Sequence, residues 1–203
     1  TLGQHSTALK RVPVVESERK YAELLATMFF ILKSPSDGDC LFLAFAKAMW
    51  VQTNSIMAGV TLDAVLAQAQ AQTVLSGLKQ TAAETRRRVV KHMGLCLDMY
   101  QEEIVLDMKH ALNAEEKTLD STSRMLRQEL LQAFPLHPEK HVDSSAARDI
   151  YLRVMSQPQT HAGFVEARAL ADVHQVVVEV YMYQEDDQGQ PSTEPALTFG
   201  QQY

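Results

Sequence analysis

The sequence predicts an α+β domain in which helices come first and strands cluster late. Apolar residues recur at helical spacing through most of the chain up to residue 173. The β-branched run Gln175–Tyr181 then predicts a central strand, and residues 196–200 predict one more. With 203 residues, 46% of them apolar, the chain is long enough to bury a sizeable core in one domain.

Each element follows from its local pattern. Residues 1–16 form a lead-in, since residues 1–15 lack a clear periodicity, and the domain proper is expected over residues 17–203. The segment 61–78 is rich in Ala, Gln and Leu, which predicts a helical insertion or lid. The acidic segment 185–189 predicts a turn. Apolar spacing predicts helices over residues 16–30, 40–51, 61–78, 84–110, 113–133, 146–155 and 163–173.

Composition narrows the classes of function. A net charge of −6 argues against nonspecific nucleic-acid binding. The longest largely apolar stretch, Leu24–Leu32, is far shorter than the ~20 residues of a membrane-spanning helix, and no signal-peptide pattern is present. Two cysteines make no disulfide framework, which favours a reducing compartment: the cytoplasm or nucleus, or a host cytosol for a delivered effector. No metal or cofactor is expected, since no Cys-x-x-Cys spacing is present.

The segment 36–46 carries the strongest chemical signal. Cys40 directly follows a turn containing Gly38 and directly precedes an apolar helix. A helix N-terminus stabilises a thiolate, and Asp39 suits the N-cap position that would make Cys40 the first helical residue. Gly38 allows a backbone conformation that turns N–H groups toward a substrate oxygen. Taken alone, a cysteine in an apolar context is more often an inert buried residue.

Residues 37–44, Asp-Gly-Asp-Cys-Leu-Phe-Leu-Ala, resemble the Asp-Gly-Asn-Cys-Leu-Phe-Arg-Ala signature of the OTU (ovarian tumour) cysteine proteases. A second block, Tyr151–Met155 followed by residues 160–171, is similar to the family's Trp-Gly-Gly-x-x-Glu-x-x-Ala-Leu-Ala block. There His161 replaces the usual Trp, and Ala162 replaces the first Gly. The helix around residues 81–100 also resembles the family's Leu-Arg-x-x-Val-Val helix. Residues 51–80 and 104–145 are then variable helical regions.

The resemblance implies a papain-like OTU fold, with helices around a small β-sheet and helical insertions. It implies a deubiquitinase that cleaves after the ubiquitin C-terminus, with Cys40 as nucleophile and ubiquitin or polyubiquitin chains as partners. The backbone from Asp37 to Cys40, including Gly38 and Asp39, would bind the oxyanion. The Asp37 carboxylate would order that loop, although Asp before Gly is also a common Asx-turn residue. His161 and Gly163 would lie near the substrate channel.

The general base is the missing part of this resemblance. OTU enzymes carry their catalytic His after the last strands, whereas residues 199–203 resemble the segment just before the final strand. We therefore expect a piece that lacks this strand and its His and that is weak or inactive alone. His161 is the best internal substitute, with half-buried packing as the alternative. A catalytically inactive ubiquitin-binding or scaffolding module is the alternative function.

The remaining notable residues have structural interpretations. The cluster of residues 86–88 with Lys91 could form a binding patch, but a solvated helix face is the favoured interpretation. Cys96, in the middle of a predicted helix, is expected to be inert core. His174 is expected to have a capping or surface role at the end of a helix.

Overall fold

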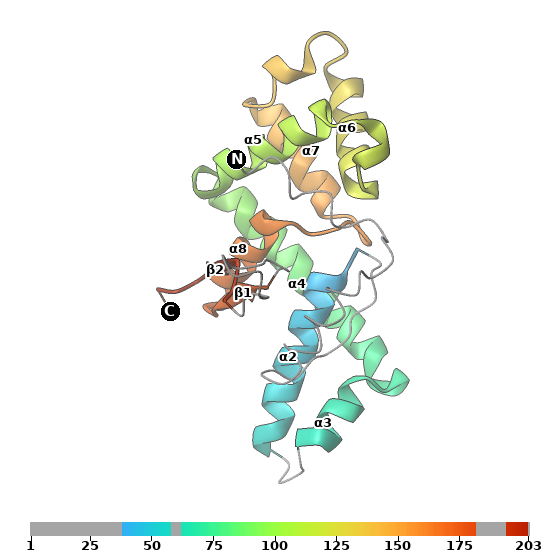
Figure 1. Cartoon of the computed structure of the whole chain (residues 1–203), viewed down its shortest axis with the longest axis vertical. Helices are drawn as coiled ribbons and strands as arrows, with labels where there is room; N and C mark the ends of the chain where they lie inside the picture. The colour runs from blue at the N-terminus through green and yellow to red at the C-terminus, as the bar shows by residue number, and fades with distance from the viewer. Residues whose placement is uncertain (1–37, 58–61, 182–193, 203) are drawn as a thin grey trace, which may run out of the picture.

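The computed structural model describes residues 38–57, 62–181 and 194–202, which form a mostly helical molecule with one small sheet (Figure 1). The expected lead-in, the helix over 16–30, Asp37 and the acidic turn at 185–189 lie outside the described residues. The helices are α2 (Cys40–Met57), α3 (Leu62–Ala69), α4 (Gln72–Leu95), α5 (Leu97–Asn113), α6 (Ser121–Ala133), α7 (Ser145–Met155) and α8 (Phe164–His174). Short 3-10 turns cover Glu116–Thr118 and Pro138–Lys140, and the strands are β1 (Val178–Val180) and β2 (Leu197–Phe199). This arrangement agrees with the predicted α+β class.

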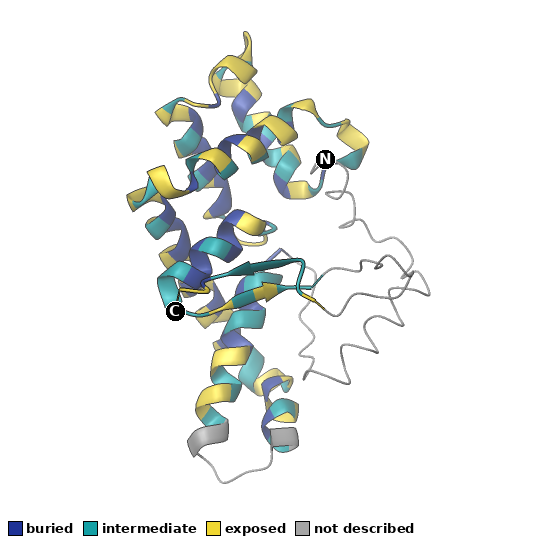
Figure 2. Cartoon of the chain, turned by 60° about the vertical axis from the view of Figure 1, so that its left-hand side comes forward, coloured by how far each residue is buried: buried dark blue, intermediate teal, exposed yellow. Residues whose placement is uncertain are grey.

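Helix α4 is the central element of the fold. It packs against α2 on one side and α8 on another, while α5, α6 and α7 pack together at the far end of the molecule (Figure 1). The residues coloured as buried in Figure 2 lie mainly where these helices face one another. The largest fully buried side chains include Phe42 of α2, Met93 of α4, Tyr100 and Ile104 of α5, Tyr151 of α7 and Leu170 of α8. The shared core fixes α2, α4 and α8 relative to one another.

The sheet consists of two antiparallel strands in which Val178 pairs with Phe199 and Val180 with Leu197. The first strand is shorter than the predicted run from 175. Gln175 ends α8 instead, in the left-handed conformation with φ of 52°, and its N–H donates to the carbonyl of Ala171. The strand therefore begins only once the backbone has left this helix cap.

The prediction of one continuous helix over 84–110 is wrong, because the helix is interrupted at Cys96, which has φ of −115° and ψ of 41°. Helix α4 also begins earlier than predicted, at Gln72, so the segment 61–78 divides between α3 and α4. A straight helix through α4 and α5 would be roughly 60 Å long at 1.5 Å per residue and could not stay on one core. The break lets α5 pack on α6 and α7 instead.

The predicted helix over 113–133 is also corrected. Helix α5 ends at Asn113, a 3-10 turn follows, and α6 begins only at Ser121. Asp120 is the N-cap of α6, and its carboxylate accepts a hydrogen bond from the Ser123 N–H at 2.7 Å. None of the helices in the described ranges is long and apolar enough to cross a membrane.

Candidate active site

Cys40 is the first residue of α2, as the sequence predicts, and its thiol is free and half-buried. The loop before it needs glycine at position 38 for two reasons. Gly38 has φ of +90°, and a Cβ placed on it would lie 1.9 Å from the carbonyl oxygen of Gln159. The nucleophile loop, residues 38–40, is therefore pressed directly against the loop of residues 156–163, the neighbouring loop.

Asp39 occupies the position before the helix, and its carbonyl accepts the first helical bond, from the Leu43 N–H at 2.9 Å. Its carboxylate reaches away from the helix. Asp39 Oδ1 accepts from Arg86 Nη2 at 2.8 Å and Nε at 3.1 Å, and Oδ2 accepts from the Gln159 N–H at 3.3 Å. Asp39 thus ties the nucleophile loop both to α4 and to the neighbouring loop.

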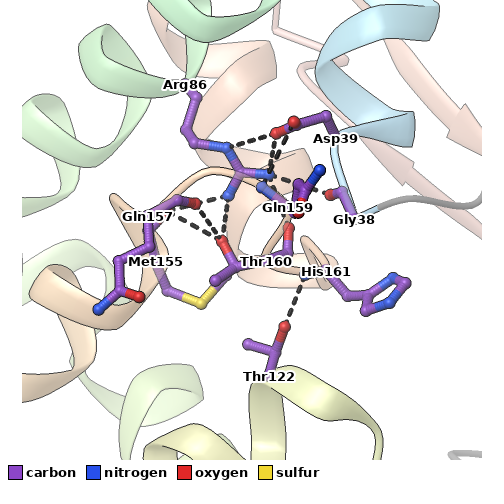
Figure 3. Close-up of polar contacts among 9 residues, drawn as sticks. All are labelled: Gly38, Asp39, Arg86, Thr122, Met155, Gln157, Gln159, Thr160 and His161. Carbon is purple, nitrogen blue, oxygen red and sulfur yellow. Dashed lines mark hydrogen bonds and ion pairs between the residues drawn. The ribbon is translucent and has the colours of Figure 1, made fainter.

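Arg86 is the centre of these contacts (Figure 3). Its side chain is only 3% exposed and its guanidinium lies 4.6 Å from the centre of the Phe42 ring. Besides Asp39, it donates to the carbonyls of Gly38 at 3.0 Å and Met155 at 2.9 Å, and to both oxygens of Thr160. The guanidinium therefore binds the nucleophile loop and the neighbouring loop at once, and we call this set of contacts the Arg86 clamp.

The prediction that Arg86 lies on a solvated face is wrong, although it holds for Arg87 and Arg88, which are exposed. The signal that identifies Arg86 is its spacing. Ala82, Arg86, Val89 and Met93 recur at intervals of three and four residues and share the buried stripe of α4. A cation on such a stripe must have partners inside the fold.

His161 lies in the neighbouring loop, half-buried, and its N–H donates to Thr122 Oγ1 at 2.6 Å. Its imidazole points away from the Arg86 guanidinium in Figure 3. Across the described part of the chain, no hydrogen bond joins an imidazole to the Cys40 thiol. The position of His161 thus fits the packing alternative better than that of a base for Cys40.

Gly163 ends the neighbouring loop as the N-cap of α8, and its N–H donates to Glu166 Oε2 at 2.7 Å. Glu166 is fully buried, and Tyr151 Oη lies 3.0 Å from both Glu166 Oε1 and Asp107 Oδ2. We call Tyr151, Asp107 and Glu166 the acid cluster. Burial raises the pKa of Glu166 from 4.5 to about 7, and burial also raises the pKa of Asp107 and of Tyr151.

A model of the OTU-like cysteine protease family matches residues 35–198, which is most of the chain. The chain belongs to the OTU-like cysteine protease family. No curated protein and no solved structure shows a match to it. The matched span includes the nucleophile loop, the Arg86 clamp and the acid cluster.

Membership in the OTU-like cysteine protease family gives Cys40 its chemical context, since the family is one of thiol proteases. The structure brings Gly38, Asp39 and Cys40 together with the neighbouring loop that carries His161 and Gly163. Asp37 lies outside the described residues. Over the described ranges, no group of three or more His, Cys, Asp or Glu side chains is arranged to hold a metal ion.

Two residues outside the OTU-like site also differ in detail from expectation. Cys96 is half-buried at the break between α4 and α5 and not in the middle of a helix; it packs against the edge of the core, with its sulfur 3.9 Å from His92 Nδ1. The His174 ring lies 4.4 Å from the Phe45 ring, and burial, with a smaller effect of Arg88, lowers its pKa. His174 therefore packs on α2 at Phe45, which is five residues after Cys40.

Proposed function

We propose that this chain is a deubiquitinase that hydrolyses isopeptide or peptide bonds after the ubiquitin C-terminus. The observation that carries the proposal is the placement of Cys40 at the first residue of α2, behind a glycine turn held by buried contacts. The family membership supports a thiol protease chemistry. The ubiquitin substrate, the papain-like details of the fold and action in the reducing cytoplasm or nucleus are parts of the proposal.

In the proposed reaction, the Cys40 thiolate attacks the carbonyl carbon of the last glycine of ubiquitin. The new S–C bond forms as the C=O π bond opens, and the backbone N–H groups of the nucleophile loop bind the resulting oxyanion. The C–N bond then breaks, and the leaving amine takes a proton from an imidazolium. Water hydrolyses the thioester and regenerates the thiol. We assign the imidazole to a histidine outside the described residues.

A labelling experiment tests this function on the longest natural polypeptide that contains the chain. A ubiquitin probe with a C-terminal electrophile should label wild-type protein, and Cys40→Ala should abolish the labelling. Cys96→Ala is the matched control, because it removes the other thiol and should leave labelling intact. Labelling that persists in Cys40→Ala would contradict the assignment of the nucleophile.

The alternative is a ubiquitin-binding or scaffolding module without catalysis. It is favoured by one observation: within the described ranges, the Cys40 thiol makes no hydrogen bond to an imidazole. Binding and turnover separate the two functions. A scaffold would bind ubiquitin chains with the same affinity in wild type and Cys40→Ala and would release no ubiquitin, whereas the enzyme would release ubiquitin only in wild type.

A further inference from the structure

Helix α5 has one face in the core and another turned to solvent. Its core face consists of buried residues at helical spacing: Tyr100, Ile104, Val105, Met108 and Ala111. The flanks of this face are tied to neighbouring helices. Gln101 Oε1 accepts a hydrogen bond from Arg148 Nη1 of α7 at 2.9 Å. Glu103 forms an ion pair with Arg168 of α8. These contacts fix which side of α5 is turned outward.

The outer face of α5 consists of exposed residues at alternating intervals of three and four: Met99, Glu102, Leu106, Lys109 and Asn113. This spacing is that of the contact positions in a two-stranded coiled coil. Two of the side chains are large and apolar, since Met99 is 49% exposed and Leu106 is 62% exposed. One exposed leucine by itself is ordinary for a protein surface. Here the apolar residues share their row with a pattern of charges.

The charges of the outer face have opposite signs on the two sides of Leu106. Glu102 comes four residues before Leu106 and Lys109 three residues after it, which corresponds to about 6 Å and about 4.5 Å along the helix axis. Neither side chain forms an ion pair within the part of the chain that the structure describes. The outer face is therefore complementary in charge to a second copy of itself that runs in the opposite direction.

We propose that the outer face of α5 is a dimer interface, on which a second copy of this chain packs its own α5 in the antiparallel direction. Around a two-fold axis at Leu106, each Leu106 contacts its counterpart, and each Glu102 lies beside Lys109 of the second copy. A parallel pair would instead place Glu102 against Glu102 and Lys109 against Lys109, so the charges select the antiparallel arrangement. The proposal goes beyond the proposed function and does not depend on it.

The size of the interface sets its expected strength. Helix α5 has 17 residues, so it is about 25 Å long. Stable protein interfaces bury roughly 1,200–2,000 Å² in total, and one pair of helices of this length lies at or below the lower end of that range. We therefore expect a weak dimer, whose formation is measurable between about 10 µM and about 1 mM protein.

Sedimentation of the whole chain over this range of concentration tests the proposal. The average mass of wild type should rise from 22.7 kDa toward twice that value as the concentration increases. Leu106→Glu should raise the dissociation constant of the dimer at least ~10-fold, because it places two carboxylates at the two-fold axis. Leu136→Glu is the control, because Leu136 is 78% exposed and lies outside α5, and its substitution should leave the dissociation constant unchanged.

Exchange of the two charges tests the direction of the helices. Glu102→Lys alone creates two contacts between lysines, and Lys109→Glu alone creates two contacts between carboxylates, so each should weaken the dimer at least ~3-fold. The double substitution Glu102→Lys with Lys109→Glu restores two attractive pairs. Its dissociation constant should return to within about 2-fold of wild type. The differences among these variants should shrink as salt is added.

Three results would overturn the proposal. If wild type stays monomeric up to about 1 mM, no second copy binds the outer face, and the face is free or serves a different partner. If Leu106→Glu leaves the dimer unchanged, the dimer uses another surface. If the double charge variant is as weak as the single variants, the helices are not antiparallel. Recovery in the double variant, together with a weakened Leu106→Glu and an unchanged Leu136→Glu, would support the proposal. If Leu106→Glu does not fold, the charge variants decide.

Discussion

Replacement of Glu166 by Gln should make the folded chain more stable above neutral pH. The reason lies in the proton count of the acid cluster. The Tyr151 hydroxyl has one proton but lies 3.0 Å from carboxylate oxygens of both Asp107 and Glu166. Both contacts are hydrogen bonds only if one carboxyl is protonated and donates to the tyrosine oxygen. The cluster therefore holds a proton that the unfolded chain would have lost.

The pKa of Glu166 gives the size of the effect. Burial raises it from 4.5 to about 7, so the folded chain binds more protons than the unfolded chain between these values. The free energy of unfolding then falls as pH rises through this window, and the contribution of Glu166 is fully present only below about pH 4.5. At 1.36 kcal/mol per pKa unit, the loss reaches roughly 3 kcal/mol above pH 7.

The substitution Glu166→Gln would reproduce the neutral form of the side chain. The new amide can donate to Tyr151, and its oxygen can accept from the Gly163 N–H that now binds Glu166. In urea unfolding at pH 5, 6, 7 and 8, the free energy of unfolding of wild type should fall by about 3 kcal/mol more across this range than that of Glu166→Gln. Glu84→Gln is the matched control on an exposed carboxylate, and it should keep the wild-type pH dependence. If Glu166→Gln and wild type show the same pH dependence of stability, the inference that the folded acid cluster retains a proton is refuted.

Three further outcomes concern the nucleophile loop and the neighbouring loop. Gly38→Ala should lower labelling of Cys40 by the ubiquitin electrophile at least ~10-fold, because the new Cβ would lie 1.9 Å from a backbone atom of Gln159. Gly77→Ala is the control, because Gly77 has open space around it and its substitution should leave labelling unchanged. Equal labelling of the two variants would contradict the close contact at Gly38. Iodoacetamide should modify Cys40 faster than Cys96 in peptide mapping, because Cys40 begins a helix, and the reverse order would contradict its activation. His161→Ala should change ubiquitin turnover less than ~10-fold, since its ring points away from the clamp, and a larger loss would make it a candidate base.

Local patterns in the sequence were sufficient for much of the site. The turn at Gly38, the start of a helix at Cys40 and the helix beginning after Gly163 are determined by a few neighbouring residues, and each lies where the sequence predicts it. The two strands were also predicted, although the cap at Gln175 shortened the first. Helix ends and tight turns are short-range features, so short-range reasoning reaches them.

The acid cluster shows where such reasoning stops. Tyr151 and Asp107 are 44 residues apart, and only the packing of α5 against α7 brings them together. The break at Cys96 has the same origin, because the length of the core, and not the local spacing of apolar residues, decides where a long helix must turn. The direction of the His161 ring is likewise set by packing of the loop, which binds Thr122 on α6.

The sequence by itself determined that a helix begins at Cys40 and to which family the chain belongs. Only the tertiary structure decided that Arg86 binds the loop just before Cys40. The spacing of α4 puts this residue on the buried stripe, but its partners are Asp39, 47 residues before it, and Thr160, 74 residues after it. A buried cation must find its acceptors wherever the fold supplies them, and those positions exist only after α2, α4 and the neighbouring loop have packed together.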